Sequence, residues 1–155
     1  MSNADPSPLE IRAHRDDRED LARLSDLSLA AVSALSAHVL EAEGISAGEV
    51  DIVFCGDDRI AELNLEWLER EGPTDCIAFD LREEMDPSTV EGEVYIDISQ
   101  AERQAPEFGV TIDEEIRRLI IHGMLHLLGY DHESEDDKAI MWAKQEALLA
   151  QVMPE

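Results

Sequence analysis

Three of the chain's five histidines lie within eleven residues, at positions 122, 126 and 132. Residues four apart on an α-helix differ by about 40° in azimuth and lie about 6 Å apart along the axis, so His122 and His126 can bind one metal ion. Gly129 predicts a left-handed residue that ends this helix, after which the chain turns back and brings His132 to the same ion. Three neutral imidazoles leave the fourth position of a tetrahedral Zn²⁺ open to water, as in catalytic zinc sites. The spacing therefore predicts one zinc ion per chain.

The alternative for a histidine on an apolar helix is a structural role, with its ring N–H donated to a carbonyl. Leucine, isoleucine and methionine surround His122 and His126, so the helix is apolar nearly all round and is predicted to be buried. Two unpaired imidazoles there would each cost free energy, whereas a shared metal ion satisfies both. This favours the metal site.

Zinc peptidases of the H-E-x-x-H type carry a glutamate directly after the first histidine as general base. Here that position is Gly123, which disfavours peptide hydrolysis by that mechanism. A metal-bound water can still reach a pKa near neutrality and act as the nucleophile. The sequence assigns no general base.

The segment from His122 to His132 resembles the H-G-x-L-H-L-x-G-Y-D-H signature of the YbeY family, the bacterial single-strand-specific endoribonucleases of ribosomal RNA maturation. Two further segments agree. Leu63-Asn64 followed by Pro73-Thr74-Asp75 and Phe79 is similar to one family segment, and Gly92 to Ile96 is similar to another. The resemblance implies zinc on the three histidines and a cytoplasmic location. It also implies a role in 16S rRNA maturation and 70S ribosome quality control, with single-stranded RNA and the ribosome or its associated proteins as partners.

The basic residues depart from the family pattern. Many members carry an arginine, implicated in RNA handling, one residue after the aromatic that follows L-N. Aligning Trp67 with that aromatic places Leu68 at the arginine position, with Arg70 two residues further on as a candidate phosphate contact. Arg59 and Arg70 are eleven residues apart and would share one helix face that tracks an RNA backbone. The alternative is a pair of solvated charges.

Arg118 precedes His122 by four residues and lies on the stripe that leads to the metal site. Its guanidinium could hold a scissile phosphate through two parallel hydrogen bonds. The alternative is an ordinary helical ion pair with Glu114, four residues away.

Several carboxylates are further candidates around the site. Asp131 could orient a metal-bound imidazole or cap the final helix, two roles that the sequence does not separate. Thr74-Asp75 could position a loop over the site. Glu91, Glu93 and Asp97 are possible proton acceptors.

The composition is strongly acidic, with 12 Lys and Arg against 37 Asp and Glu and a net charge of −25. Such a surface should repel RNA, because Lys and Arg contacts with phosphate supply most non-specific affinity. Two hypotheses reconcile the charge with an RNA substrate. Either the acidic surface is adapted to high salt, where charges are screened over about 3 Å at 1 M, or a protein partner presents the RNA and only a local groove needs to be basic.

The length and hydropathy predict one domain over residues 9–155, preceded by a flexible segment over 1–8. No apolar run is long enough to span a membrane, and no signal pattern opens the chain, so secretion is not expected. Cys55 and Cys76 are predicted to be free thiols in strands.

Alternating and three-to-four-residue hydrophobic periods predict an α+β fold, in which a small mixed β-sheet packs with about five helices. The predicted strands cover about 10–15, 49–55, 76–79 and 94–98. The predicted helices cover about 20–43, 57–72 (capped by Asp57 or Asp58), 99–107, 112–128 and 135–151. The zinc site then lies at the end of the buried central helix that Thr111 and Glu114 open as a capping box.

Three functions agree with these features. The first is a metal-dependent endoribonuclease, a phosphodiester hydrolase with zinc as its cofactor. The second is a metal-dependent peptidase or amidohydrolase. The third is a non-catalytic ribosome-assembly factor that contains a metal ion.

Overall fold

The computed structural model describes residues 9–16, 28–72, 74–84, 86–131 and 133–153. Within them the chain forms four strands and five helices. In chain order these are β1 (Leu9–Arg15), α1 (Leu29–Ala42), β2 (Ala47–Cys55), α2 (Asp57–Leu68), β3 (Cys76–Asp80), β4 (Thr89–Asp97), α3 (Ile98–Glu107), α4 (Ile112–Leu127) and α5 (Glu135–Val152). The predicted α+β class is confirmed. No helix in the described part of the chain is long and apolar enough to cross a membrane.

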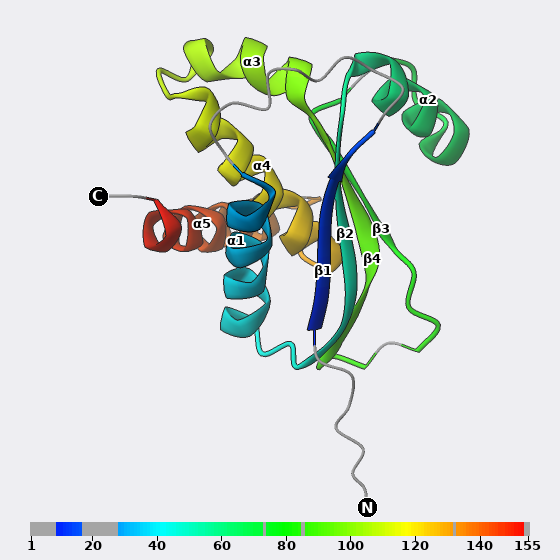
Figure 1. Cartoon of the computed structure of the whole chain (residues 1–155), viewed down its shortest axis with the longest axis vertical. Helices are drawn as coiled ribbons and strands as arrows, with labels where there is room; N and C mark the ends of the chain where they lie inside the picture. The colour runs from blue at the N-terminus through cyan, green and yellow to red at the C-terminus, as the bar shows by residue number, and fades with distance from the viewer. Residues whose placement is uncertain (1–8, 17–27, 73, 85, 132, 154–155) are drawn as a thin grey trace, which may run out of the picture.

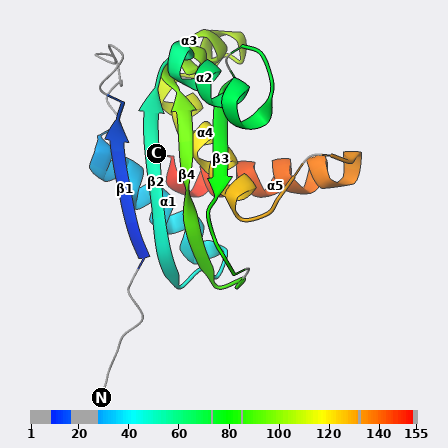
Figure 2. The ribbon, with the colours of Figure 1, turned by 90° about the vertical axis from the view of Figure 1, so that its right-hand side faces the viewer.

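The four strands form one mixed sheet in the order β1-β2-β4-β3 (Figure 2). β1, β2 and β4 are parallel, and β3 pairs with β4 in the antiparallel direction. The hairpin of β3 and β4 places the start of β3 beside the end of β4, where Asp97 N–H donates to the Asp75 carbonyl over 2.9 Å. This arrangement brings the loop before β3 to the end of the sheet at which β4 stops and α3 begins.

Helices α1 and α4 cover one face of the sheet, and α5 packs against α4 on the side away from the strands (Figure 1). The main core lies between the sheet and these helices. Its largest fully buried side chains come from the centre of β2 and from α4, including Phe54, Ile52, Ile116, Ile120 and Leu125. α4 is thus the buried central helix that the sequence predicts.

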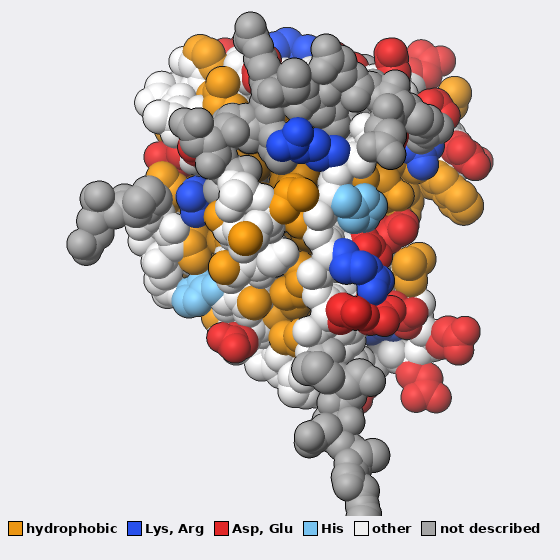
Figure 3. Space-filling model, viewed as in Figure 1, with side chains coloured by type: hydrophobic (Ala, Val, Ile, Leu, Met, Phe, Trp, Pro, Cys, Tyr) orange, Lys and Arg blue, Asp and Glu red, His pale blue; other side chains and the backbone are white. Residues whose placement is uncertain are grey.

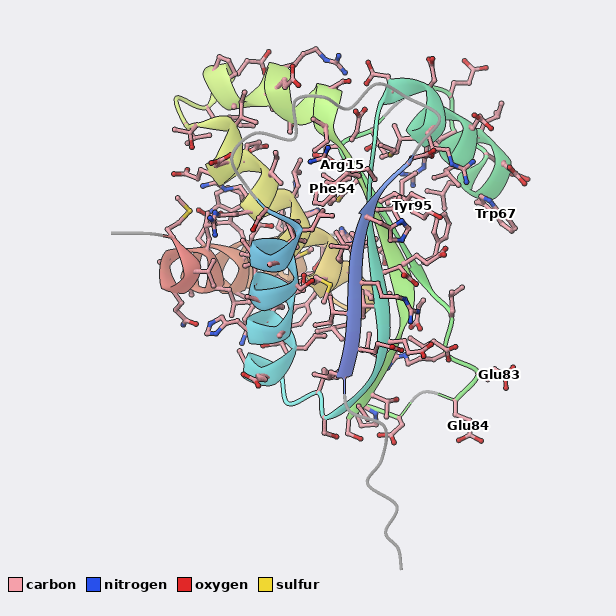
Figure 4. The ribbon with its side chains drawn as sticks, in the orientation of Figure 1. Arg15, Phe54, Trp67, Glu83, Glu84 and Tyr95 are labelled. Carbon is pink, nitrogen blue, oxygen red and sulfur yellow. The ribbon has the colours of Figure 1, made fainter. Side chains whose placement is uncertain are left out.

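The other face of the sheet carries α2 at one end and polar side chains elsewhere. A second buried cluster of Cys55, Ile60, Leu63 and Ile77 lies under α2. Tyr95 and Trp67 project from this face, away from α1 and α4 (Figure 4). On the face of the molecule that Figure 3 shows, carboxylates gather along the edge formed by the sheet and α2.

Two details of α2 differ from the predictions. Its N-cap is Gly56, with no side-chain cap, and Asp57 and Asp58 lie inside the first turn, where their charge is favourable to the helix dipole. The helix ends at Leu68 because Glu69 adopts a left-handed conformation (φ 55°). Arg70 is therefore outside the helix, and the prediction that it shares a helix face with Arg59 is wrong.

The predicted helix over 20–43 is described only from Ser28, which caps α1 by accepting from the Ala31 N–H. Residues 1–8 and most of the segment before α1 lie outside the described residues. Cys55 and Cys76 are free thiols in β2 and β3, as predicted. Burial raises the pKa of the Cys76 thiol well above its ordinary value.

Candidate metal centre

The last two turns of α4 carry the first two predicted ligands. The His122 and His126 rings have centroids 4.7 Å apart and lie nearly perpendicular to each other. Both residues are half-buried, while Met124 and Leu125 between them and Ile121 directly before them are fully buried in the core. The predicted i, i+4 pairing is therefore present on the solvent-facing stripe of an otherwise buried helix.

The start of α4 is fixed by Thr111, whose hydroxyl accepts from the Glu114 N–H over 3.1 Å. The end is a Schellman motif in which the Gly129 N–H donates to the His126 carbonyl and the Tyr130 N–H to the Leu125 carbonyl. Gly129 has φ 102°, the left-handed conformation that the sequence predicts. The chain therefore turns sharply directly after the histidine pair.

His132, the third predicted ligand, lies outside the described residues, so its role stays a prediction. Its neighbour Asp131 accepts from the Glu133 N–H over 3.3 Å. The cap of α5 is Ser134, whose hydroxyl accepts from the Asp137 N–H. The alternative in which Asp131 caps the final helix is therefore wrong.

Gln145 on α5 contacts the first histidine. Its Oε1 lies 2.7 Å from His122 Nδ1. An amide oxygen only accepts, so Nδ1 is the donor in this contact, and Nε2 is the ring nitrogen left to face a metal ion. Gln145 in turn donates from Nε2 to Glu146 over 3.1 Å, and its side chain is almost fully buried. The tautomer that a metal ligand needs is thus set by the neighbouring helix.

The residue after the first histidine faces the sheet. A Cβ added to Gly123 would lie 2.5 Å from Val94 Cγ1 on β4. A glutamate at this position would clash with the strand and could not reach the histidine pair. The structure therefore explains why the H-E-x-x-H base is absent from this helix.

Arg118 is held by three carboxylates. Its guanidinium bonds Glu114, Glu115 and Glu146 over 3.1, 3.2 and 3.0 Å. The predicted alternative, an ion pair with Glu114, is therefore confirmed. Its role as a phosphate contact stays a prediction, since a phosphate would have to compete with this cluster. Arg70 is exposed beyond α2.

A cavity of about 490 Å³ lies beside His122. Helices α3, α4 and α5 and the loop before β3 form its walls. Asp75 lies in the wall, which places the Thr74-Asp75 segment at the site, as the sequence suggested. A second hollow of about 340 Å³ shares His122, Trp142 and Gln145 with the cavity and adds Lys138 and Met141.

Helix α5 contributes residues to the site that were not predicted from the sequence. Lys138, Trp142 and Gln145 recur at four and three residues, so they share one helix face, and that helix follows directly after the histidine motif. A polar and aromatic stripe in that position is the signal that could have identified them.

The other candidate proton acceptors lie in different surroundings. Glu91 is exposed on β4, and Glu93 is 3.5 Å from the Tyr95 hydroxyl on the face away from α4. Asp97 is fully buried at the start of α3, where it caps the helix. Burial, with Asp57 nearby, raises the pKa of Asp97 to about 8. None of the three lines the cavity beside His122 among the described residues.

Comparison with known proteins places the chain in a family. A family model described as Endoribonuclease YbeY matches residues 12–153. The Endoribonuclease YbeY of Salinibacter ruber is 32% identical over 155 residues, which cover 96% of this chain and 94% of that protein. The Endoribonuclease YbeY of Aquifex aeolicus is 42% identical over 101 residues, covering 64% and 67%.

A solved structure agrees with the sequence comparisons. The solution structure of a Thermotoga maritima protein is 30% identical, has a TM-score of 0.63, and matches 92% of this chain and 88% of that one. Fold, histidine motif and relatives all indicate one conclusion: the chain belongs to the YbeY endoribonuclease family.

Proposed function

We propose that this protein is a zinc-dependent, single-strand-specific endoribonuclease that acts in 16S rRNA maturation and ribosome quality control in the cytoplasm. The observation that carries the proposal is the pair of histidines on α4, with ring centroids 4.7 Å apart and the Nδ1 of His122 bonded to Gln145. Family membership supports the ribonuclease activity, because the relatives are named as endoribonucleases. The ribosomal role and its partners rest on the resemblance alone.

The residues present fit a zinc ion. His122 and His126 would hold it from α4, and His132 would complete the set after the turn at Gly129. When bound, the ion would supply a Lewis acid for the phosphodiester and would activate water near neutral pH. The fit rests on the donor set, two imidazoles on one helix stripe, one of them with its Nδ1 already hydrogen-bonded to Gln145.

The protein's own residues perform the remaining tasks. Gln145 holds the His122 ring in one orientation and tautomer. Helix α5 covers one side of His122, where Met141 and Gln145 are buried. Lys138, one of only two lysines in the chain, lines the hollow beside His122 and would attract the RNA phosphate.

The local lysine reduces the conflict between the acidic surface and an RNA substrate. The net charge of −25 acts at long range and is screened at high ionic strength. A phosphate that reaches the hollow would meet Lys138, and a metal ion where one is held by the histidines, at short range, where screening is weak. We therefore expect RNA binding to need salt or a partner protein for approach, rather than a basic surface.

The test compares three substrates and one variant. Zinc-loaded protein is incubated with single-stranded RNA, with the same RNA in a duplex, and with casein, alongside a folded His126→Ala variant. We expect cleavage of the single strand alone, and its loss in the variant. Casein cleavage would favour a peptidase, the absence of all turnover would favour an assembly factor, and RNA cleavage that survives in the variant would indicate a contaminating nuclease.

A further inference from the structure

We propose that the cavity beside His122 receives one unstacked nucleobase of the RNA strand, with Trp142 as its stacking surface. This subsite rests on the proposed ribonuclease function and gives it a substrate contact. The cavity of about 490 Å³ lies within the range of about 300–1,000 Å³ typical of small-molecule sites.

The position of Trp142 suits this role. It lines both the cavity and the smaller hollow that contains Lys138, and both hollows include His122. A nucleotide at this point would place its base in the cavity and its phosphate between Lys138 and the histidine pair. The base and the phosphate belong to the same nucleotide, so one subsite can hold both groups.

The walls of the cavity match a planar ligand with apolar faces. Phe108 and Trp142 are 62% and 58% exposed although both line the cavity, so the described residues leave much of both side chains uncovered. Val110 and Leu119 add apolar contacts. Stacking of a base on an aromatic side chain is a sequence-tolerant interaction that single-strand-binding proteins use widely.

A phosphate group could in principle occupy the cavity in place of a base, but the negative charge of the cavity walls excludes it. The guanidinium of Arg118 is bonded to three carboxylates, and Asp75 adds a further negative charge to the wall. A phosphate would be repelled, whereas a neutral base with polar edges would not. The anionic backbone therefore stays at Lys138, outside the cavity.

Such a subsite gives a physical reason for a single-strand preference. A base in a duplex is paired and stacked on both faces, so it would have to leave the helix before it could reach Trp142. A base in a single strand enters without breaking pairs.

The direct test uses tryptophan fluorescence, because the chain has two tryptophans. In a Trp67→Phe variant Trp142 is the sole tryptophan, and the zinc-loaded variant is titrated with adenosine monophosphate and with ribose 5-phosphate, which lacks the base. We expect saturable quenching by the nucleotide and at least tenfold weaker quenching by the sugar phosphate. Equal quenching by both probes, or none by the nucleotide, would overturn the proposal.

A kinetic test uses Trp67 as the matched control. Trp67 is 63% exposed, does not line the cavity and projects from the opposite face of the sheet (Figure 4). Trp142→Ala should raise KM for a single-stranded oligoribonucleotide about tenfold, with the zinc content unchanged. Trp142→Phe should bring KM most of the way back to the wild-type value, because an aromatic ring is still present. Trp67→Ala should leave KM unchanged. If Trp142→Ala kept the wild-type KM, the base subsite would be refuted, whereas the ribonuclease function would stand. A wild-type protein that cleaves no RNA would refute the function, and the fluorescence titration still tests the subsite.

Discussion

At the scale of single residues, the site depends on contacts that orient the histidine rings. His122 bonds Gln145 over 2.7 Å, and Gln145 is itself held by Glu146. Glu146 pairs with Arg118, which lowers the pKa of this carboxyl. The ring is therefore oriented by a chain of fixed groups rather than by solvent.

Replacement of Gln145 by alanine should lower zinc affinity by about 10- to 100-fold, because the ring loses the partner that fixes its tautomer. Calorimetric titration of zinc measures the affinity, and ¹⁵N NMR of His122 reports which nitrogen is protonated. Gln151→Ala is the matched control, since Gln151 lies on α5 like Gln145 and contacts a histidine of another helix, His38 of α1, over the same 2.7 Å. Equal zinc affinities of the Gln145→Ala and Gln151→Ala variants would refute the role of Gln145 in positioning the His122 ring.

Gly123 is required by packing. Alanine in place of glycine usually stabilises a helix by about 0.5–1 kcal/mol, but here the new Cβ would clash with Val94. Gly123→Ala should therefore destabilise the protein by about 1–3 kcal/mol in urea unfolding. The double variant with Val94→Ala should lose less than the sum of the two single losses, and strict additivity would contradict the packing argument.

At the scale of elements, most of the fold could be predicted from the sequence because it depends on local signals. The hydrophobic periods locate four strands and the helices, and Thr111, Gly129 and Ser134 identify the ends of α4 and the start of α5. The end of α2 could not be predicted, because Glu69 takes a left-handed conformation without being glycine. The contact between α5 and His122 depends on tertiary packing, which hydrophobic periods do not specify.

Two carboxyl groups meet at the starts of α2 and α3: Asp97, which is buried, and Asp57, which is partly exposed. Asp97 caps α3 and lies beside Asp57, which accepts two hydrogen bonds from Arg103 over 3.0 and 2.7 Å. The pKa of Asp97 is raised to about 8, first by burial and then by Asp57. The arginine, through its hydrogen bonds, lowers the pKa of Asp57.

Because the pKa of Asp97 is raised in the folded state, the free energy of unfolding should fall as the pH rises. The folded state keeps a proton on Asp97 that the unfolded chain releases near pH 3.9. This contribution to stability is fully present below about pH 4 and is lost as the pH rises to about 8. Asparagine keeps the helix cap without the charge, so Asp97→Asn should gain up to about 4 kcal/mol over the wild type on going from pH 5 to pH 8.5, at about 1.4 kcal/mol per pH unit.

Urea unfolding at the two pH values measures this difference. Asp58→Asn is the control, because Asp58 is an exposed carboxylate in the first turn of α2. A pH profile of Asp97→Asn that runs parallel to that of the wild type would contradict the burial argument.

At the scale of the whole molecule, the main feature is charge. The net charge of −25 on 155 residues opposes the compact state through self-repulsion. Carboxylates lie along the edge of the sheet and α2 (Figure 3). Arginines such as Arg12 and Arg82 pair with some of them, but over the whole sequence acidic residues outnumber basic ones by 37 to 12. The molecule is therefore expected to be more stable where salt screens the repulsion.

Raising KCl from about 0.05 M to about 1 M should raise the Tm, because the screening length falls from more than 10 Å to about 3 Å. Differential scanning calorimetry measures the shift, with sucrose at equal osmolarity as the control for solute exclusion. A Tm that stays constant or falls in KCl would show that the acidic surface is not a salt adaptation.

The central claim is that one zinc ion binds to three histidines. Elemental analysis of the native and zinc-dialysed protein should find one zinc per chain, lost in each of His122→Ala, His126→Ala and His132→Ala. His38→Ala should retain the full content, since His38 contacts Gln151 instead. A wild-type protein without bound metal after zinc dialysis, or three histidine variants that keep it, would contradict the account.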